Sequence, residues 1–190
     1  MIQKTLNIFW QAAGGKTLFA ALVVYIFFGA VVMPAGAKKI SEVSGRKVEI
    51  LDLQFSYSPE MARHIISEYG DSGRKYAIQF GLIADTLYPI SYTFLFVVLT
   101  AWIFKAIDPI KFTRVLLLPL VIPVVDYGEN LNIAWLMYGY PQLEDWQVHL
   151  SSLFTSLKWS LVVLQVLVIV GALLCLVYNK LSGKNTIARM

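Results

Sequence analysis

The chain has 190 residues, of which 57% are hydrophobic and only 15% charged, and its mean hydropathy is +0.63. Soluble domains average about 25% charged residues, so the composition excludes an ordinary soluble domain and predicts an integral membrane protein. The formal net charge of +4 does not indicate binding to nucleic acid, because lysines and arginines gather at the ends of apolar segments, as membrane anchors do. The single cysteine, Cys175, excludes an internal disulfide and a dithiol redox pair.

The first two predicted elements are a short helix and a membrane span. Residues 2–13 carry apolar side chains at helical spacing, which predicts an N-terminal helix lying in the membrane interface. The Gly14–Gly15 pair then breaks this helix. The first span is predicted at residues 17–35, an uncharged apolar run that Pro34 and Gly36 are expected to close.

Residues 37–75 form the main polar segment, and we expect them to make a small extramembrane cap. Within it, residues 48–55 resemble a short strand, although the alternation of apolar and polar side chains is incomplete. The sequence from Ser58 to Glu60 predicts a helix start, with serine as N-cap and proline in the first turn, and Gly70 predicts its end. The cap is therefore expected to hold a short strand plus a helix. The alternative is that the segment only connects two spans.

Three further spans are predicted at residues 75–104, 115–140 and 149–178. The chain is thus predicted to be an all-α protein with a single domain, a four-helix transmembrane bundle whose termini lie on one side. Basic residues are slightly more numerous in the terminal segments and the turn at residues 105–114 than in the cap. This distribution favours cytoplasmic termini in a multi-pass protein of the cell membrane.

Four residues of full charge lie inside the predicted spans: Asp85, Asp126, Glu129 and Lys158. Ionisable groups at membrane depth are costly and usually functional. The helical rise of 1.5 Å per residue places Asp85, Glu129 and Lys158 each about 15 Å below the face that carries the cap. Because three spans bring charge to one level, we predict a site there with these four side chains as the catalytic candidates.

Polar and aromatic side chains lie beside the four charges. Most share a helix face with a charge at a spacing of three, four or seven residues, whereas Arg74 lies eleven residues before Asp85 on the same side and Trp159 directly follows Lys158. We expect six of them to contact a substrate: Arg74, Tyr88, Tyr92, Asn130, Thr155 and Trp159. Prolines lie beside the predicted site as well. Pro89 cannot donate to the carbonyl of Asp85, and Pro119 and Pro123 predict a kinked or locally unwound third span.

The sequence leaves three functions open. The first is acid–base chemistry on a lipid or other lipophilic small molecule, with a carboxyl moving a proton and Lys158 stabilising negative charge. The second is binding of a lipophilic ligand, or proton-coupled transport along intramembrane charges. The third is a structural or accessory membrane subunit whose polar core joins its helices. Membrane lipids or a lipophilic ligand are the expected partners, and a homodimer or a larger membrane complex is a further option.

No cofactor and no metal are expected from the sequence. The chain has no Gly-x-Ser-x-Gly motif, and its two histidines are too few for a histidine-based metal centre. Oxygen ligands for Mg²⁺ or Ca²⁺ could come from the predicted site, but Lys158 would oppose a cation there.

Overall fold

The computed structural model describes residues 2–107 and 113–182. All regular structure in these two ranges is helical, and four helices are long and apolar enough to cross a membrane, which confirms the predicted helical fold with four candidate spans. The first candidate span joins α2, η1 and α3, and the third joins η3 and α6. In chain order the elements are α1 (Ile2–Ala12), α2 (Gly15–Phe27), the π-helical η1 (Phe28–Val32), α3 (Met33–Ser44), the 3-10 turn η2 (Leu51–Leu53), α4 (Pro59–Glu68), α5 (Gly70–Ile107), η3 (Thr113–Leu116), α6 (Leu117–Gly139) and α7 (Asp145–Leu181).

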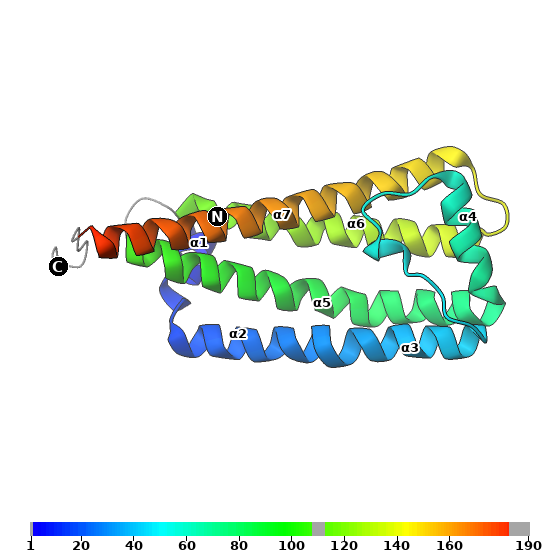
Figure 1. The fold of residues 1–190 in the computed structure, drawn as a ribbon, viewed down its shortest axis with the longest axis horizontal. Helices are drawn as coiled ribbons and strands as arrows, with labels where there is room; N and C mark the ends of the chain where they lie inside the picture. The colour runs from blue at the N-terminus through cyan, green and yellow to red at the C-terminus, as the bar shows by residue number, and fades with distance from the viewer. Residues whose placement is uncertain (1, 108–112, 183–190) are drawn as a thin grey trace.

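The long helix α5 is the centre of the bundle (Figure 1). It contacts α2 and α3 on one side and α6 and α7 on the other. Two glycines let the first long helix approach α5 closely and antiparallel to it. A Cβ atom at Gly36 would lie 2.0 Å from the ring of Phe80, and one at Gly73 would lie 2.2 Å from Oγ of Ser44. The α2–α3 side of the bundle is therefore held by near backbone contact.

The helix of the first predicted span does not close at Pro34 and Gly36 as expected. The helix continues through α3 to Ser44 and ends at Gly45, whose φ of +69° is left-handed. The π-helical turn η1 lies just before the proline, and the N–H of Met33 donates to the carbonyl of Phe28. Such a local change of helix type lets a proline remain inside a membrane helix, because it pairs the backbone groups that the proline would leave free.

The connection between α3 and α5, residues 45–69, differs from the predicted cap. The described residues contain no strand, and Leu51–Leu53 forms one 3-10 turn, so the predicted strand is wrong. A strand needs a neighbour to pair with. Here side chains of α7 bond to this backbone instead. Residues 37–44 and 70–75 extend α3 and α5, which leaves residues 45–69, called the connecting segment below.

The helix predicted within the connecting segment is confirmed as α4. Oγ of Ser58 accepts a hydrogen bond of 3.2 Å from the N–H of Met61, as an N-cap does, and Pro59 opens the helix. Gly70, with a φ of +59°, separates α4 from α5. Since α5 begins at Gly70, the second helix starts earlier than the predicted boundary at residue 75.

The N-terminal helix α1 is confirmed as a helix, and the glycine break after it is also present. Leu6 and Trp10 of α1 pack against Val97 and Ala101 of α5, at the end of the bundle opposite α4 (Figure 1). Its location in a membrane interface stays a prediction.

Unwinding of the third span is not observed. Helix α6 is α-helical from Leu117 to Gly139, with Pro119 in its first turn and Pro123 inside it. A proline in the first turn costs no helical hydrogen bond, which explains why the helix tolerates Pro119. Parts of the predicted turn at residues 105–114, namely 108–112, and of the basic tail, namely 183–190, lie outside the described residues.

Candidate functional site

A cavity of about 480 Å³ lies between the α2–α3 helix, α5, α6, α7 and the connecting segment. Its lining is mostly aliphatic and aromatic, with a few charged side chains. Ligand pockets in proteins usually measure about 300–1,000 Å³ and combine an apolar wall with a small number of polar groups. Four charged residues line this cavity: Asp52, Asp85, Asp126 and Lys158.

Lys158 of α7 and Glu129 of α6 form an ion pair, with 2.5 Å between Nζ and Oε2. The exposed fractions of Glu129 and Lys158 are 0% and 7%. Lys158 lines the cavity whereas Glu129 does not, so Glu129 lies behind the wall. Its second oxygen, Oε1, has no hydrogen-bond partner among the described residues. The pair therefore joins α6 to α7 and compensates the charge of Lys158.

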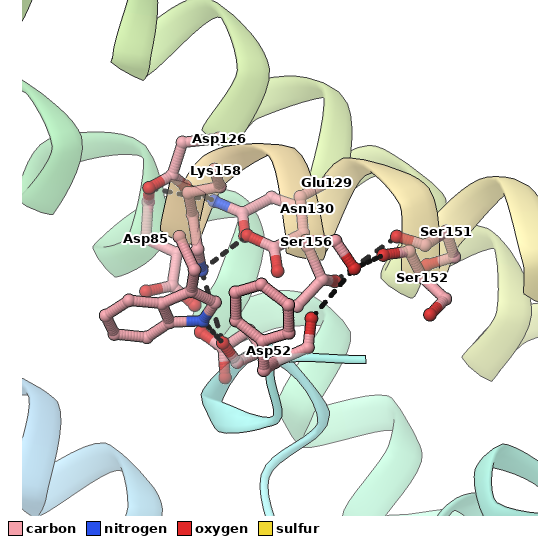
Figure 2. A network of polar contacts seen from close by, with 12 residues as sticks. Asp52, Asp85, Asp126, Glu129, Asn130, Ser151, Ser152, Ser156 and Lys158 are labelled. Carbon is pink, nitrogen blue, oxygen red and sulfur yellow. Dashed lines mark hydrogen bonds and ion pairs between the residues drawn. The ribbon is translucent and has the colours of Figure 1, made fainter. Parts of the chain in front are cut away.

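Asp126 is held in place by two donors. Oδ2 accepts a hydrogen bond of 2.6 Å from the hydroxyl of Tyr92. Oδ1 accepts one of 3.1 Å from Nδ2 of Asn130, and Figure 2 shows Asp126 and Asn130 side by side. Nδ2 of Asn130 also donates to the main-chain carbonyl of Asp85, 3.1 Å away. This is the carbonyl that Pro89 was predicted to leave without its helical donor. One carboxamide thus ties α5 to α6 next to a fixed carboxylate.

Asp85 is different, because its carboxyl group is not bonded. The side chain is half-buried and lines the cavity. In the part of the chain that the structure describes, its carboxyl group makes no hydrogen bond and no ion pair. Gly81, one turn earlier, leaves open space beside it, since a Cβ atom there would come no closer than 3.9 Å to Oδ2 of Asp85. This carboxyl is available to a molecule in the cavity.

The connecting segment contributes a fourth acid, Asp52, which the sequence analysis missed. Its main-chain carbonyl accepts hydrogen bonds from Nζ of Lys158 at 3.3 Å and from Nε1 of Trp159 at 3.0 Å (Figure 2). Its side chain lines the cavity, and Oδ1 is buried without a hydrogen-bond partner among the described residues. The signal in the sequence was an acid directly between Leu51 and Leu53, which a solvent-exposed loop would not need.

Three serines of α7 and Tyr57 bind the rest of this stretch to the bundle. The N–H of Tyr57 donates to Oγ of Ser152 at 2.9 Å, and its hydroxyl donates to Oγ of Ser151 at 2.7 Å. Oγ of Ser156 donates to the carbonyl of Phe55 at 2.9 Å. Burial raises the pKa of Tyr57 above its ordinary value, so the phenol stays protonated and keeps its role as a donor. The connecting segment is therefore docked on α7 by polar contacts at several points.

An aromatic wall runs along α5 on the cavity side. The rings of Tyr25 and Tyr88 are stacked with centroids 6.2 Å apart, and those of Tyr88 and Tyr92 meet edge to face at 5.5 Å. Phe96 continues the series, with its centroid 6.0 Å from that of Tyr92. All four residues line the cavity, as does Trp159 on the opposite helix α7.

The structure brings most of the predicted site residues together. Glu129 lies directly behind the wall, and Thr155 lies near Tyr57, with 3.4 Å between the hydroxyl oxygens, rather than on the cavity. Arg74 is not part of the site. It lies near the start of α5, forms an ion pair with Asp71 and stacks on the ring of Tyr140 at 4.7 Å. The predicted residues that line the cavity are Asp85, Tyr88, Tyr92, Asp126, Asn130, Lys158 and Trp159.

Possible metal ligands and similarity to known proteins are two further sources of information on the site. Over residues 2–107 and 113–182, no three His, Cys, Asp or Glu side chains are arranged to hold a metal ion. No known protein family, curated protein or solved structure matches this chain. The chain's own features are a helical fold, four helices long and apolar enough to cross a membrane, and a largely apolar cavity between them that carries a few charges.

Proposed function

We propose that this protein binds a lipophilic small molecule in the cavity between its membrane helices. The observation that carries the proposal is the cavity itself, about 480 Å³ in volume, apolar over most of its wall and charged at a few points. This combination is typical of sites that hold an apolar body and orient it through a polar end. The surrounding helices are apolar enough to lie in a bilayer, where lipophilic molecules are concentrated.

The purely structural alternative fits the polar contacts less well. A polar core that only joins helices is expected to pair its buried groups with one another, because an unpaired buried polar group costs about 1–3 kcal/mol. Asp126 and Lys158 follow this pattern. Asp85 and Asp52 do not, since their carboxyl groups face the cavity without a bonded partner in the described part of the chain.

Acid–base conversion of the bound molecule is a second candidate function. It is favoured by the contrast between two neighbouring carboxyl groups, one without bonded partners on Asp85 and one fixed by Tyr92 and Asn130 on Asp126. Two carboxyls in different surroundings can divide the roles of proton donor and electrostatic stabiliser. In this function Asp85 exchanges the proton and Asp126 stays in place.

The binding proposal is tested by filling the cavity. Gly81→Leu adds a side chain to the cavity wall at a helical position, where leucine is favoured over glycine by about 1 kcal/mol, so the variant should fold. Gly171→Leu is the matched control, because Gly171 is exposed on α7 and a Cβ atom there meets nothing within 4 Å. Lipids extracted from the purified full-length proteins are compared by mass spectrometry.

We expect a lipophilic molecule that copurifies with the wild type and with Gly171→Leu and is lost from Gly81→Leu. Identical extracts from all three proteins contradict binding in this cavity. The conversion function is tested in cells that lack the protein and are complemented with wild type, Asp85→Asn or the exposed-site variant Asp71→Asn. Accumulation of one lipid class with Asp85→Asn alone supports conversion, whereas a wild-type lipid profile from a folded, ligand-retaining Asp85→Asn protein leaves binding as the function.

A further inference from the structure

We infer that the molecule held in this cavity carries a cationic amine on an apolar body, an inference that rests on the proposed function and specifies its ligand. The carboxyls of Asp52, Asp85 and Asp126 and the aromatic wall of α5 share one cavity. The negative charge of the carboxyls and the faces of the aromatic rings both favour a cationic group on the ligand.

The first argument is the balance of charge on the wall. Three acids line the cavity, namely Asp52, Asp85 and Asp126. Among the described lining residues, Lys158 is the single basic one. Lys158 is already compensated by Glu129 at 2.5 Å from behind the wall. A carboxylate or phosphate head group would thus meet an excess of acids, since Lys158 is one base among four acids, the three of the wall and Glu129 behind it. An ammonium group would supply the missing positive charge, and charge–charge attraction is strong where water is scarce.

The second argument is the aromatic surface next to these acids. Tyr25, Tyr88 and Tyr92 line the same cavity from α2 and α5. The ring of Trp159 on α7 already has a cation beside it, because Nζ of Lys158 lies 5.1 Å from its centroid. Rings attract a cation placed over their faces, by about 0.5–2 kcal/mol each, and pockets that bind substituted ammonium groups combine such faces with acids. A neutral hydroxyl or a carboxylate gains nothing from the faces of these rings.

The apolar body of the ligand follows from the remaining wall. Aliphatic side chains from the α2–α3 helix, α5, α6 and α7 complete the lining, among them Met33, Ile78, Ile133 and Val162. The volume of about 480 Å³ suits a molecule in the size range of ordinary small-molecule ligands. The inferred class is thus a lipophilic tertiary or quaternary amine.

The test compares three probes with the same alkyl tail and different heads: N,N-dimethyldodecylamine, dodecanol and dodecanoate. Binding to the purified full-length protein is measured at neutral pH in a non-ionic detergent, and binding that persists in Gly81→Leu is subtracted as unspecific.

We expect the wild type to bind the amine about tenfold or more tightly than the alcohol, and the carboxylate most weakly. In Asp85→Asn the affinity for the amine should fall about tenfold and that for the alcohol about twofold or less. Asp71→Asn, an acid-to-amide change at an exposed position of the same helix, should bind all three probes like the wild type.

The other outcomes separate the two proposals. Equal affinity for amine and alcohol, or tighter binding of the carboxylate, overturns the cationic ligand and leaves the lipophilic cavity standing. If no probe binds saturably above the Gly81→Leu level, both proposals fall. Should Asp85→Asn fail to fold, as judged by gel filtration and thermal unfolding, Asp52→Asn in the connecting segment takes its place with the same expected loss of amine affinity.

Discussion

The side-chain amide of Asn130 donates a hydrogen bond of 3.1 Å to the main-chain carbonyl of Asp85, across the contact between α5 and α6. The same nitrogen bonds Oδ1 of Asp126 at 3.1 Å. Pro89 explains why the carbonyl accepts a side chain, because a proline has no N–H to donate to the residue four positions earlier. The missing N–H of Pro89 thus leaves a carbonyl on α5 that binds Asn130 of α6, close to Asp85 and Asp126.

This relationship predicts coupling between Asn130 and Pro89. Asn130→Ala should lower the free energy of unfolding by about 1–3 kcal/mol, since it leaves the partly buried carbonyl of Asp85 unpaired. Pro89→Ala restores the helical N–H, so Asn130→Ala should cost less in that background. A double-mutant cycle in detergent, followed by thermal or denaturant unfolding, measures the difference. Strict additivity of the two substitutions contradicts this role of the carbonyl.

The ion pair between Lys158 and Glu129 predicts a strong asymmetry between single and double substitution. Lys158→Met leaves Glu129 buried without its partner and should destabilise the protein by about 3–5 kcal/mol. The pair Lys158→Met with Glu129→Gln removes both charges and should recover most of that loss. Unfolding in detergent checks both.

Lys39→Met is the control for the ion pair, because Lys39 pairs with Glu42 at the exposed surface of α3 and should contribute at most about 1 kcal/mol. If Lys158→Met costs no more than Lys39→Met, the buried pair does not stabilise the bundle.

The contacts from α7 to the connecting segment predict how readily that segment opens locally. Trp159→Phe with Ser156→Ala removes the bond from α7 to the carbonyl of Phe55 and one of the two bonds to the carbonyl of Asp52, leaving the one from Lys158. Backbone amides of residues 50–57 should then exchange hydrogen about tenfold faster or more, because local opening needs less free energy. Amides of α4 should change little, since its own helical bonds remain. Mass-spectrometric hydrogen exchange on the full-length protein measures both.

The control for this experiment is Ser160→Ala, since Ser160 is exposed on α7 and bonds only to the carbonyl of Ser156 in the described structure. Unchanged exchange at residues 50–57 in the double variant would show that other contacts dock the segment.

Close packing at Gly128 gives a further prediction. A Cβ atom there would lie 2.4 Å from the ring of Phe154, so Gly128→Ala should destabilise the α6–α7 contact by about 1–3 kcal/mol through overpacking. Phe154→Leu frees space and should reduce that loss when the two are combined. Gly171→Ala is the matched control, and it should be neutral or slightly stabilising, because nothing lies within 4 Å and alanine favours helix. Thermal unfolding of the wild type, the three single variants and the combined variant checks these expectations, and a neutral Gly128→Ala contradicts them.

Several parts of the fold and the site follow from local properties of the sequence. The lengths of the apolar runs predicted four helices, and Ser58 with Pro59 marked the start of α4. The constant rise of a helix was enough to predict that Asp85, Glu129 and Lys158 lie near one level, because depth along a helix depends only on residue number. Pro89 likewise predicted that the main-chain carbonyl of Asp85 lacks its helical donor, because a proline has no N–H.

Tertiary structure alone decided which of these groups face a cavity. The bonds from Lys158 and Trp159 to the carbonyl of Asp52 join residues more than a hundred positions apart. They hold residues 48–55, which the sequence predicted as a strand, as a loop against α7. Local pattern cannot show this, because whether an extended backbone pairs with a strand or with side chains depends on what folds against it. The same holds for Glu129, which pairs with Lys158 behind the cavity wall, and for Arg74, which pairs with Asp71 and stacks on the ring of Tyr140 away from the cavity.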